Sequence, residues 1–202
     1  MAFGGRTVAL ATGVGNVRSV VRALEKSASQ VVTTADPEEV RRADVLVVPG
    51  QGSFGAFANA LDGGLREVVL ERIRAGTPYL GICLGLQILF EDSDEAPGAK
   101  GLAVFAGSVR RLEPGNEALP HMGWNRAERV TESALFDSEY FYFAHTYAAV
   151  PADPAVTLAT TTYGTQTFTS AVASGAVVGV QFHPEKSQRA GLALIQRFFE
   201  RL

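Results

Sequence analysis

The chain has 202 residues, of which 47% are hydrophobic and 19% are charged, and its formal net charge is −3 at pH 7. A chain of this size and composition can bury a large core, so we expect residues 1–202 to form a single domain. The net negative charge and the lack of a cluster of basic residues argue against a nucleic-acid partner. The apolar runs are too short for a membrane span or a signal peptide. The single cysteine excludes an internal disulfide and favours a cytoplasmic protein.

The first half of the chain alternates predicted strands with predicted helices. Short apolar runs predict buried strands at 7–12, 31–32, 45–48 and 78–82. Cap residues and helical spacing predict helices after Asn16, after Asp36-Pro37, at 54–61, at 65–74 and from Leu84 to about Glu91. This alternation predicts an α/β fold with three layers, in which a mostly parallel sheet has helices on both faces.

The second half has a different pattern. An acidic segment at 91–98 reads as a solvated loop. Short β-rich segments separated by turns then follow, and we expect them to be antiparallel additions to the sheet. They lie at 108–112, 124–130, 140–147, 156–162, 166–173 and 177–182. A last helix is expected at about 187–202, with its apolar residues on one face.

Cys83, the only cysteine, is at the centre of Gly81-Ile82-Cys83-Leu84-Gly85, between a strand pattern and a helix pattern. Glycines on both sides permit a sharp strand-to-helix turn that presents a nucleophile at the sheet edge. The N-terminus of the following helix would favour the reactive thiolate. A lone cysteine is more often a small buried hydrophobe, and the position at the turn is what favours the nucleophile.

A candidate base and acid follow another predicted strand. His183 and Glu185 are two residues apart, so they project to the same side of an extended chain. With Cys83 they would form a nucleophile, base and orienting acid. His121 and His145 are alternative bases, although the aromatic residues around His145 suggest core packing. One thiolate together with His183 and Glu185 provides too few ligands for a usual zinc site.

A thiol nucleophile also needs donors for the oxyanion that forms. The backbone N–H of Leu84 is one candidate, and the glycine-rich segment containing Gly50 and Gln51 is the second. A peptide in this segment could point its carbonyl, rather than its N–H, at the site until another molecule binds, so we expect the chain alone to be a poor catalyst. The segment lacks the Lys-Ser/Thr ending of a phosphate-binding loop, and the segment 13–16 lacks a full dinucleotide fingerprint.

Several blocks in the same order carry a family resemblance. With the cysteine and histidine motifs, the chain resembles the class I glutamine amidotransferases, and among them the glutaminase subunits of imidazole glycerol phosphate synthases. The additional blocks are 13–16, 49–54, 120–125, 142–147 and 183–187. One departure is Ala11-Thr12, where many members have Asp-Tyr.

The resemblance implies hydrolysis of the side-chain amide of glutamine. Cys83 would form a γ-glutamyl thioester and release ammonia, His183 would act as base and then acid, and Glu185 would hold the imidazole. It also implies that glutamine is contacted by Gly52, Gln87, Thr146 and Tyr147. No cofactor or metal is implied.

The resemblance further implies a partner. Ammonia would pass to a (β/α)8-barrel cyclase subunit in a heterodimer, which forms imidazole glycerol phosphate and an aminoimidazole carboxamide ribonucleotide in histidine biosynthesis. Because ammonia must not escape into water, the partner should cover the nucleophile's side of the molecule. Asn16, Trp124 and Lys186 are candidates for that face. The alternatives are the glutaminase of another synthase, a free-standing γ-glutamyl peptidase or thiol hydrolase, and a non-catalytic module on the same fold.

Overall fold

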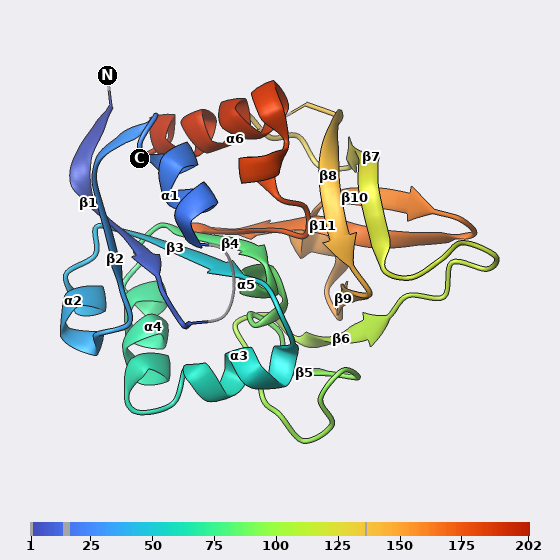
Figure 1. Cartoon of the computed structure of the whole chain (residues 1–202), viewed down its shortest axis with the longest axis horizontal. Coiled ribbons are helices and arrows are strands. Elements are labelled where there is room, and N and C mark those ends of the chain that lie inside the picture. The colour runs from blue at the N-terminus through green and yellow to red at the C-terminus, as the bar shows by residue number, and fades with distance from the viewer. Residues whose placement is uncertain (1, 14–16, 136) are drawn as a thin grey trace.

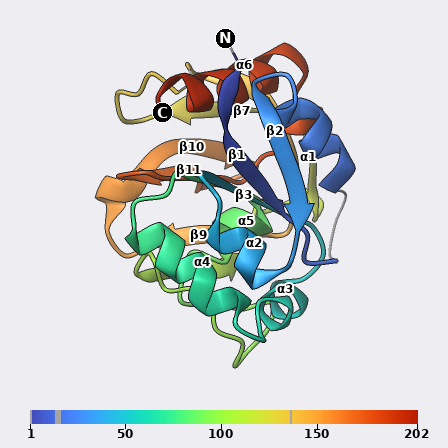
Figure 2. The same cartoon turned by 90° about the vertical axis from the view of Figure 1, so that its left-hand side faces the viewer.

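The computed structural model describes residues 2–13, 17–135 and 137–202, and it places a twisted sheet between two layers of helices (Figures 1 and 2). The strands are β1 (Phe3–Leu10), β2 (Ala28–Thr34), β3 (Val45–Gly50), β4 (Tyr79–Cys83), β5 (Asp92–Ser93), β6 (Gly107–Arg111), β7 (His121–Arg129), β8 (Glu139–His145), β9 (Tyr147–Pro151), β10 (Thr157–Tyr163), β11 (Gln166–Ser174) and β12 (Val177–Val180). The helices are α1 (Val17–Leu24), α2 (Pro37–Arg41), α3 (Phe54–Ala60), α4 (Leu65–Arg74), α5 (Leu84–Gln87) and α6 (Gln188–Glu200), with short 3₁₀ turns η1 (Pro154–Val156) and η2 (Pro184–Lys186).

The centre of the sheet is parallel. Its strands run in the order β2-β1-β3-β4-β12, and every neighbouring pair in this set is parallel. All six residues of β3 are buried, because helices cover both faces of the sheet at this point. The carboxyl ends of β3, β4 and β12 therefore meet at one edge. The predicted three-layer α/β fold is confirmed.

The antiparallel additions continue the sheet from β12 through β11, β10, β7 and β8, toward the right of Figure 1. The prediction of one strand over 140–147 is wrong. The chain leaves β8 at His145 and begins β9 at Tyr147, because β8 pairs with β7 whereas β9 pairs with β6 and β11. Thr146 lies at the break between these two pairings.

Two groups of helices cover the two faces of the sheet. Helices α1 and α6 lie together on one face, and α2, α3 and α4 lie on the other (Figure 2). Each layer has its own apolar cluster against the sheet. One cluster includes Leu24, Ile195 and Phe198, and the other includes Phe57 and Val69. The expected apolar face of the last helix is confirmed.

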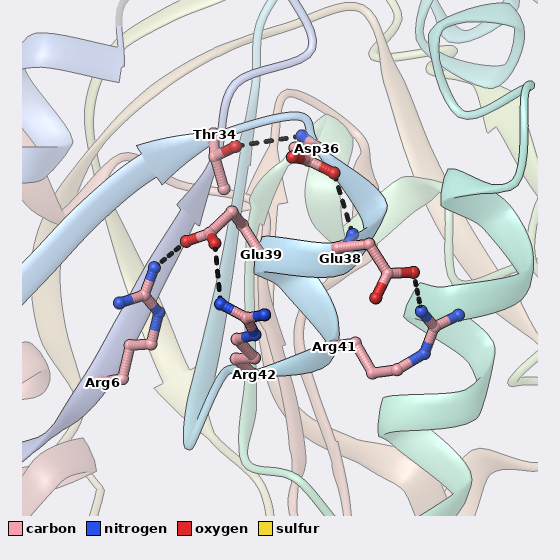
Figure 3. A network of polar contacts seen from close by, with 7 residues as sticks. All are labelled: Arg6, Thr34, Asp36, Glu38, Glu39, Arg41 and Arg42. Atoms are coloured by element: carbon pink, nitrogen blue, oxygen red, sulfur yellow. Dashed lines mark hydrogen bonds and ion pairs between the residues drawn. The ribbon is translucent and has the colours of Figure 1, made fainter.

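Helix α2 shows how local sequence fixes a helix start. The Asp36 side chain accepts a hydrogen bond of 2.9 Å from the backbone N–H of Glu38, and Pro37 occupies the first helical turn. Glu39 pairs with Arg6 of β1, which ties the helix to the sheet (Figure 3). The predicted cap at Asp36 is confirmed.

The helix expected from Leu84 to about Glu91 is much shorter. Helix α5 ends at Gln87, and the N–H groups of Leu89 and Phe90 bond carbonyls three residues back. The carbonyls of Ile88 and Phe90 accept bonds from the 102–103 backbone, at 2.6 and 3.2 Å, instead of continuing the helix. A returning loop therefore ends this helix, and no local residue marks the end.

The acidic segment at 91–98 is not simply solvated. Ser93 is buried in the short strand β5, and Asp94 pairs with Arg110 of β6 at 2.5 Å. Glu95 Oε2 accepts a 2.6 Å bond from the backbone N–H of Phe54, at the start of α3. These contacts fold the segment back over the end of the sheet.

Candidate active site

Cys83 ends β4 in a conformation that few side chains adopt. Its φ is 55° and its ψ is −106°, so the chain turns sharply into α5. A Cβ at position 81 would lie 2.2 Å from the carbonyl oxygen of Gly85, and one at position 85 would lie 1.7 Å from the carbonyl oxygen of Val48. Both glycines are therefore needed for the turn. Because α5 is a single turn, few aligned peptide dipoles act on the sulfur.

The structure brings His183 and Glu185 to this turn. Strand β12 pairs with β4 so that Val180 lies opposite Ile82, and the chain then continues past the cysteine. His183 Nδ1 lies 2.8 Å from Glu185 Oε1, and both side chains are 2% exposed. The Cys83 thiol is the other group that interacts with this imidazole, and it raises the pKa of His183. A thiol, an imidazole and a carboxylate thus lie together in one buried group, which is the set of side chains that nucleophilic catalysis by a cysteine requires.

The pKa of His183 is raised to about 9. Burial alone would lower this pKa, but the hydrogen bonds and charges of Cys83 and Glu185 outweigh burial. The imidazole is therefore protonated at neutral pH. A positive charge therefore lies next to the cysteine at this pH.

The other two histidines have a different environment. His145 Nδ1 lies 2.9 Å from the carbonyl oxygen of Tyr147, and His145 Nε2 lies 3.1 Å from His121 Nδ1. A carbonyl only accepts, so His145 donates through Nδ1 and accepts from His121 through Nε2. Burial lowers the pKa of His145 to about 3 and that of His121 to about 4. Both are neutral at pH 7, and neither contacts a carboxylate among the described residues.

A pocket of about 310 Å³ opens beside Cys83. It is lined by Gln51, Gly52, Cys83, Leu84, Gln87, Glu95, Pro120, Ala144, His145, Thr146, Tyr147, His183 and Lys186. Most of the residues predicted for the oxyanion hole and for glutamine are in this wall. Gly50 is not: it lies underneath, opposite Cys83 in the β3–β4 register, where a Cβ would meet Leu84 Cβ at 2.5 Å.

Glu95 is the pocket residue that sequence reasoning missed most clearly. It lies in the segment expected to be solvated, and its bond to the N–H of Phe54 turns it toward the pocket. No local pattern predicts this, because the position depends on a donor that lies 41 residues earlier in the chain. Pro120 lies in a block that carries the family resemblance, and the sequence alone predicts no role for it.

The residues predicted for a partner interface are placed as follows. Asn16 lies outside the described residues. Trp124 is 48% exposed on β7 and packs edge-on against Tyr142, with ring centroids 6.4 Å apart. Lys186 lines the pocket, and its Nζ lies 5.8 Å from the centre of the same Tyr142 ring. The exposed tryptophan therefore lies close to the pocket wall.

Two kinds of feature are absent from the described part of the chain. In residues 2–13, 17–135 and 137–202, no cluster of three or more His, Cys, Asp or Glu side chains could hold a metal ion. Within the same residues, no helix has both the length and the apolar character needed to cross a membrane.

Comparison with known proteins places this site in a family. The sequence model of the family described as "Glutamine amidotransferase class-I" matches residues 9–202. The chain belongs to the class-I glutamine amidotransferase family. It is also similar over almost its whole length to curated proteins that bear one particular name, imidazole glycerol phosphate synthase subunit HisH.

The similarity covers most of this chain and most of each relative. The HisH of Pyrococcus furiosus is 44% identical over 190 residues, which are 92% of this chain and 94% of that protein. The HisH of Deinococcus radiodurans is 47% identical, covering 92% and 89%, and that of Aquifex aeolicus is 43% identical, covering 96% and 95%.

Solved structures support the fold. A crystal structure of a glutamine amidotransferase superimposes with a TM-score of 0.76 at 21% identity, covering 96% of this chain and 97% of that one. The structure of PurLQS from Thermotoga maritima gives 0.77 at 18% identity, covering 100% and 99%. At these identities the likeness concerns the fold alone.

Proposed function

We propose that the chain is the glutaminase subunit of an imidazole glycerol phosphate synthase in histidine biosynthesis. It hydrolyses the side-chain amide of glutamine and supplies the ammonia to a cyclase subunit. The observation that carries the proposal is the buried contact of Cys83, His183 and Glu185 at a strained strand end, in a chain that resembles HisH subunits over about nine-tenths of its length.

The first half of the reaction uses the thiolate and the protonated imidazole. Cys83 Sγ attacks the side-chain carbonyl carbon of glutamine, and the carbonyl oxygen becomes an oxyanion. The N–H of Leu84 and a peptide N–H of the Gly50–Gln51 segment stabilise that oxyanion. His183 gives its proton to the leaving nitrogen, the carbon–nitrogen bond breaks, and ammonia departs from a γ-glutamyl thioester.

The second half regenerates the cysteine. His183, now neutral, takes a proton from a water molecule, which attacks the thioester carbon. The carbon–sulfur bond breaks, glutamate is released, and the thiolate faces a protonated imidazole again. Glu185 accepts from Nδ1 throughout, so that Nε2 faces the sulfur and the water.

Glutamine fits the polar groups of the pocket wall. Gln87 donates through Nε2 to Tyr147 O and to Gln181 Oε1, so its own carbonyl oxygen is the atom that would face the substrate. Gly52, Thr146 and Tyr147 border the same space. The carboxylate of Glu95 supplies a negative group suited to the α-ammonium of the substrate.

The partner would be a (β/α)8-barrel cyclase, which forms a cytoplasmic heterodimer with this chain. It would bind over the exposed face of the β7–β8 strand pair. This face exposes Met122, Trp124 and Tyr140, which are 62%, 48% and 58% exposed. Large apolar side chains that gather on a surface mark protein contacts. Lys186 borders both this face and the pocket, and Asn16 is the third candidate contact. A partner here would cover the ammonia exit.

The test is an assay of ammonia and glutamate from glutamine, with the chain alone and with a barrel cyclase and its nucleotide ligand. We expect the complex to be far more active, by about 10²–10³ if one oxyanion donor is missing in the chain alone. Cys83→Ala should abolish glutamine-dependent synthesis and leave ammonia-dependent synthesis intact. Full activity of the chain alone would identify a free-standing hydrolase instead.

A further inference from the structure

A buried amide side chain lies against the sulfur of Cys83. Gln181 Nε2 is 3.5 Å from Cys83 Sγ, and Gln181 is 0% exposed. The sheet sets this contact: Val180 lies opposite Ile82, so the next residue on each strand comes alongside the other. The backbone N–H of Gln181 bonds Ser170 O at 2.9 Å, which fixes its main chain.

The direction of the amide is fixed by a main-chain carbonyl. Tyr147 O lies 2.9 Å from the amide end of Gln87, and because a carbonyl only accepts, the facing atom of Gln87 is its nitrogen. The same nitrogen lies 3.0 Å from the Gln181 amide, so the facing atom there is the oxygen. The nitrogen of Gln181 must then point to Cys83. A donor therefore faces the sulfur.

A donor at this position acts differently on the two forms of the thiol. An N–H donor stabilises a charged acceptor more than a neutral one, and burial strengthens the difference. We propose that Gln181 is a further catalytic residue, which donates its amide N–H to the thiolate of Cys83, with Gln87 as the positioning residue that turns it. The proposal rests on the proposed function in that Cys83 is the nucleophile.

Alkylation of Cys83 by iodoacetamide tests this without glutamine. The chain has one cysteine, so the rate reports on one thiol, and that thiol lines the pocket. The rate is measured against pH for the full wild-type chain, Gln181→Met and Gln181→Glu. The matched control is Gln196→Met, the same substitution on the exposed face of α6. Circular dichroism and thermal unfolding identify the folded variants.

We expect the midpoint of the pH profile to rise by about one pH unit in Gln181→Met, so that the rate below the midpoint falls about tenfold. Gln181→Glu should raise it further, since this residue can still accept from Gln87 but turns a carboxylate oxygen to the sulfur. Gln196→Met should leave the wild-type profile unchanged. Gln87→Met keeps Gln181 but removes the hydrogen bond that orients its amide, so it should raise the midpoint by a smaller amount.

An unchanged midpoint in folded Gln181→Met and Gln181→Glu would overturn the proposal and leave the amide as a space-filling group. If Gln181→Met does not fold, Gln181→Glu carries the test, because it keeps the shape and the contact to Gln87. Failure of the proposed function would appear separately, as absence of ammonia release by the wild-type complex, and it would leave these alkylation profiles as they are.

Discussion

Gly85→Ala is expected to be among the most damaging small substitutions in this chain. The new Cβ would lie 1.7 Å from the carbonyl oxygen of Val48, whereas ordinary contact begins at 3.4 Å. The blocking atom is backbone in the buried central strand β3, so it cannot rotate away. The turn itself must retreat by more than an ångström. Overpacking of this kind costs about 3 kcal/mol or more, and a shift of about 1 Å at the nucleophile lowers turnover about 10²-fold.

Urea unfolding and glutamine hydrolysis by the complex measure the two effects. Gly4→Ala is the matched control, since a Cβ at position 4 meets nothing within 4 Å and its φ is not in the left-handed region. It should change the free energy of unfolding by less than about 1 kcal/mol. A Gly85→Ala protein with wild-type stability and turnover would refute the steric account of the turn.

Three further predictions concern the triad and the partner. His183→Ala should lower glutamine turnover more than Glu185→Gln, because proton transfer contributes more than orientation; equal losses in steady-state assays would contradict this. The pKa of His183 is raised to about 9, so its protonation stabilises the folded chain fully below about pH 6.5, its ordinary value. That contribution is lost as pH rises through 9, so the difference in free energy of unfolding between wild type and Glu185→Gln, measured by chemical unfolding, should shrink between these two pH values. A difference that stays constant with pH would contradict this prediction. Trp124→Ala should weaken cyclase binding in gel filtration without changing the melting temperature, and undiminished binding would move the interface elsewhere.

The parts of the fold that local sequence controls could be predicted. The buried strand at Val45–Val48 is a continuous apolar run, helix α4 spans 65–74 as expected, and Asp36 caps α2. Each of these features depends on residues within a few positions of one another. The turn at Cys83 was predicted for the same reason, since its glycines flank it directly.

The parts that distant contacts control could not be predicted. Helix α5 ends after one turn because the backbone N–H groups of Leu102 and Ala103 donate to the carbonyls of Ile88 and Phe90. Glu95 reaches the pocket because a helix start 41 positions earlier supplies its donor. The break at Thr146 separates two pairings, of which one is with β7 and the other with β6 and β11. In each case the local sequence contains no signal of the distant residues that determine the local structure.

The strain at Cys83 supports its proposed role as nucleophile over the alternative of a small buried hydrophobe. A non-glycine residue at φ 55° and ψ −106° costs of order 1–3 kcal/mol, and packing alone would be served by an unstrained residue. The same conformation holds the sulfur at the edge where β3, β4 and β12 end, close to the imidazole of His183 and to the amide of Gln181. A slip of β12 by one residue would turn alternate side chains to the opposite face and remove both partners. Sheet register, rather than any single loop, therefore assembles the chemistry of this site.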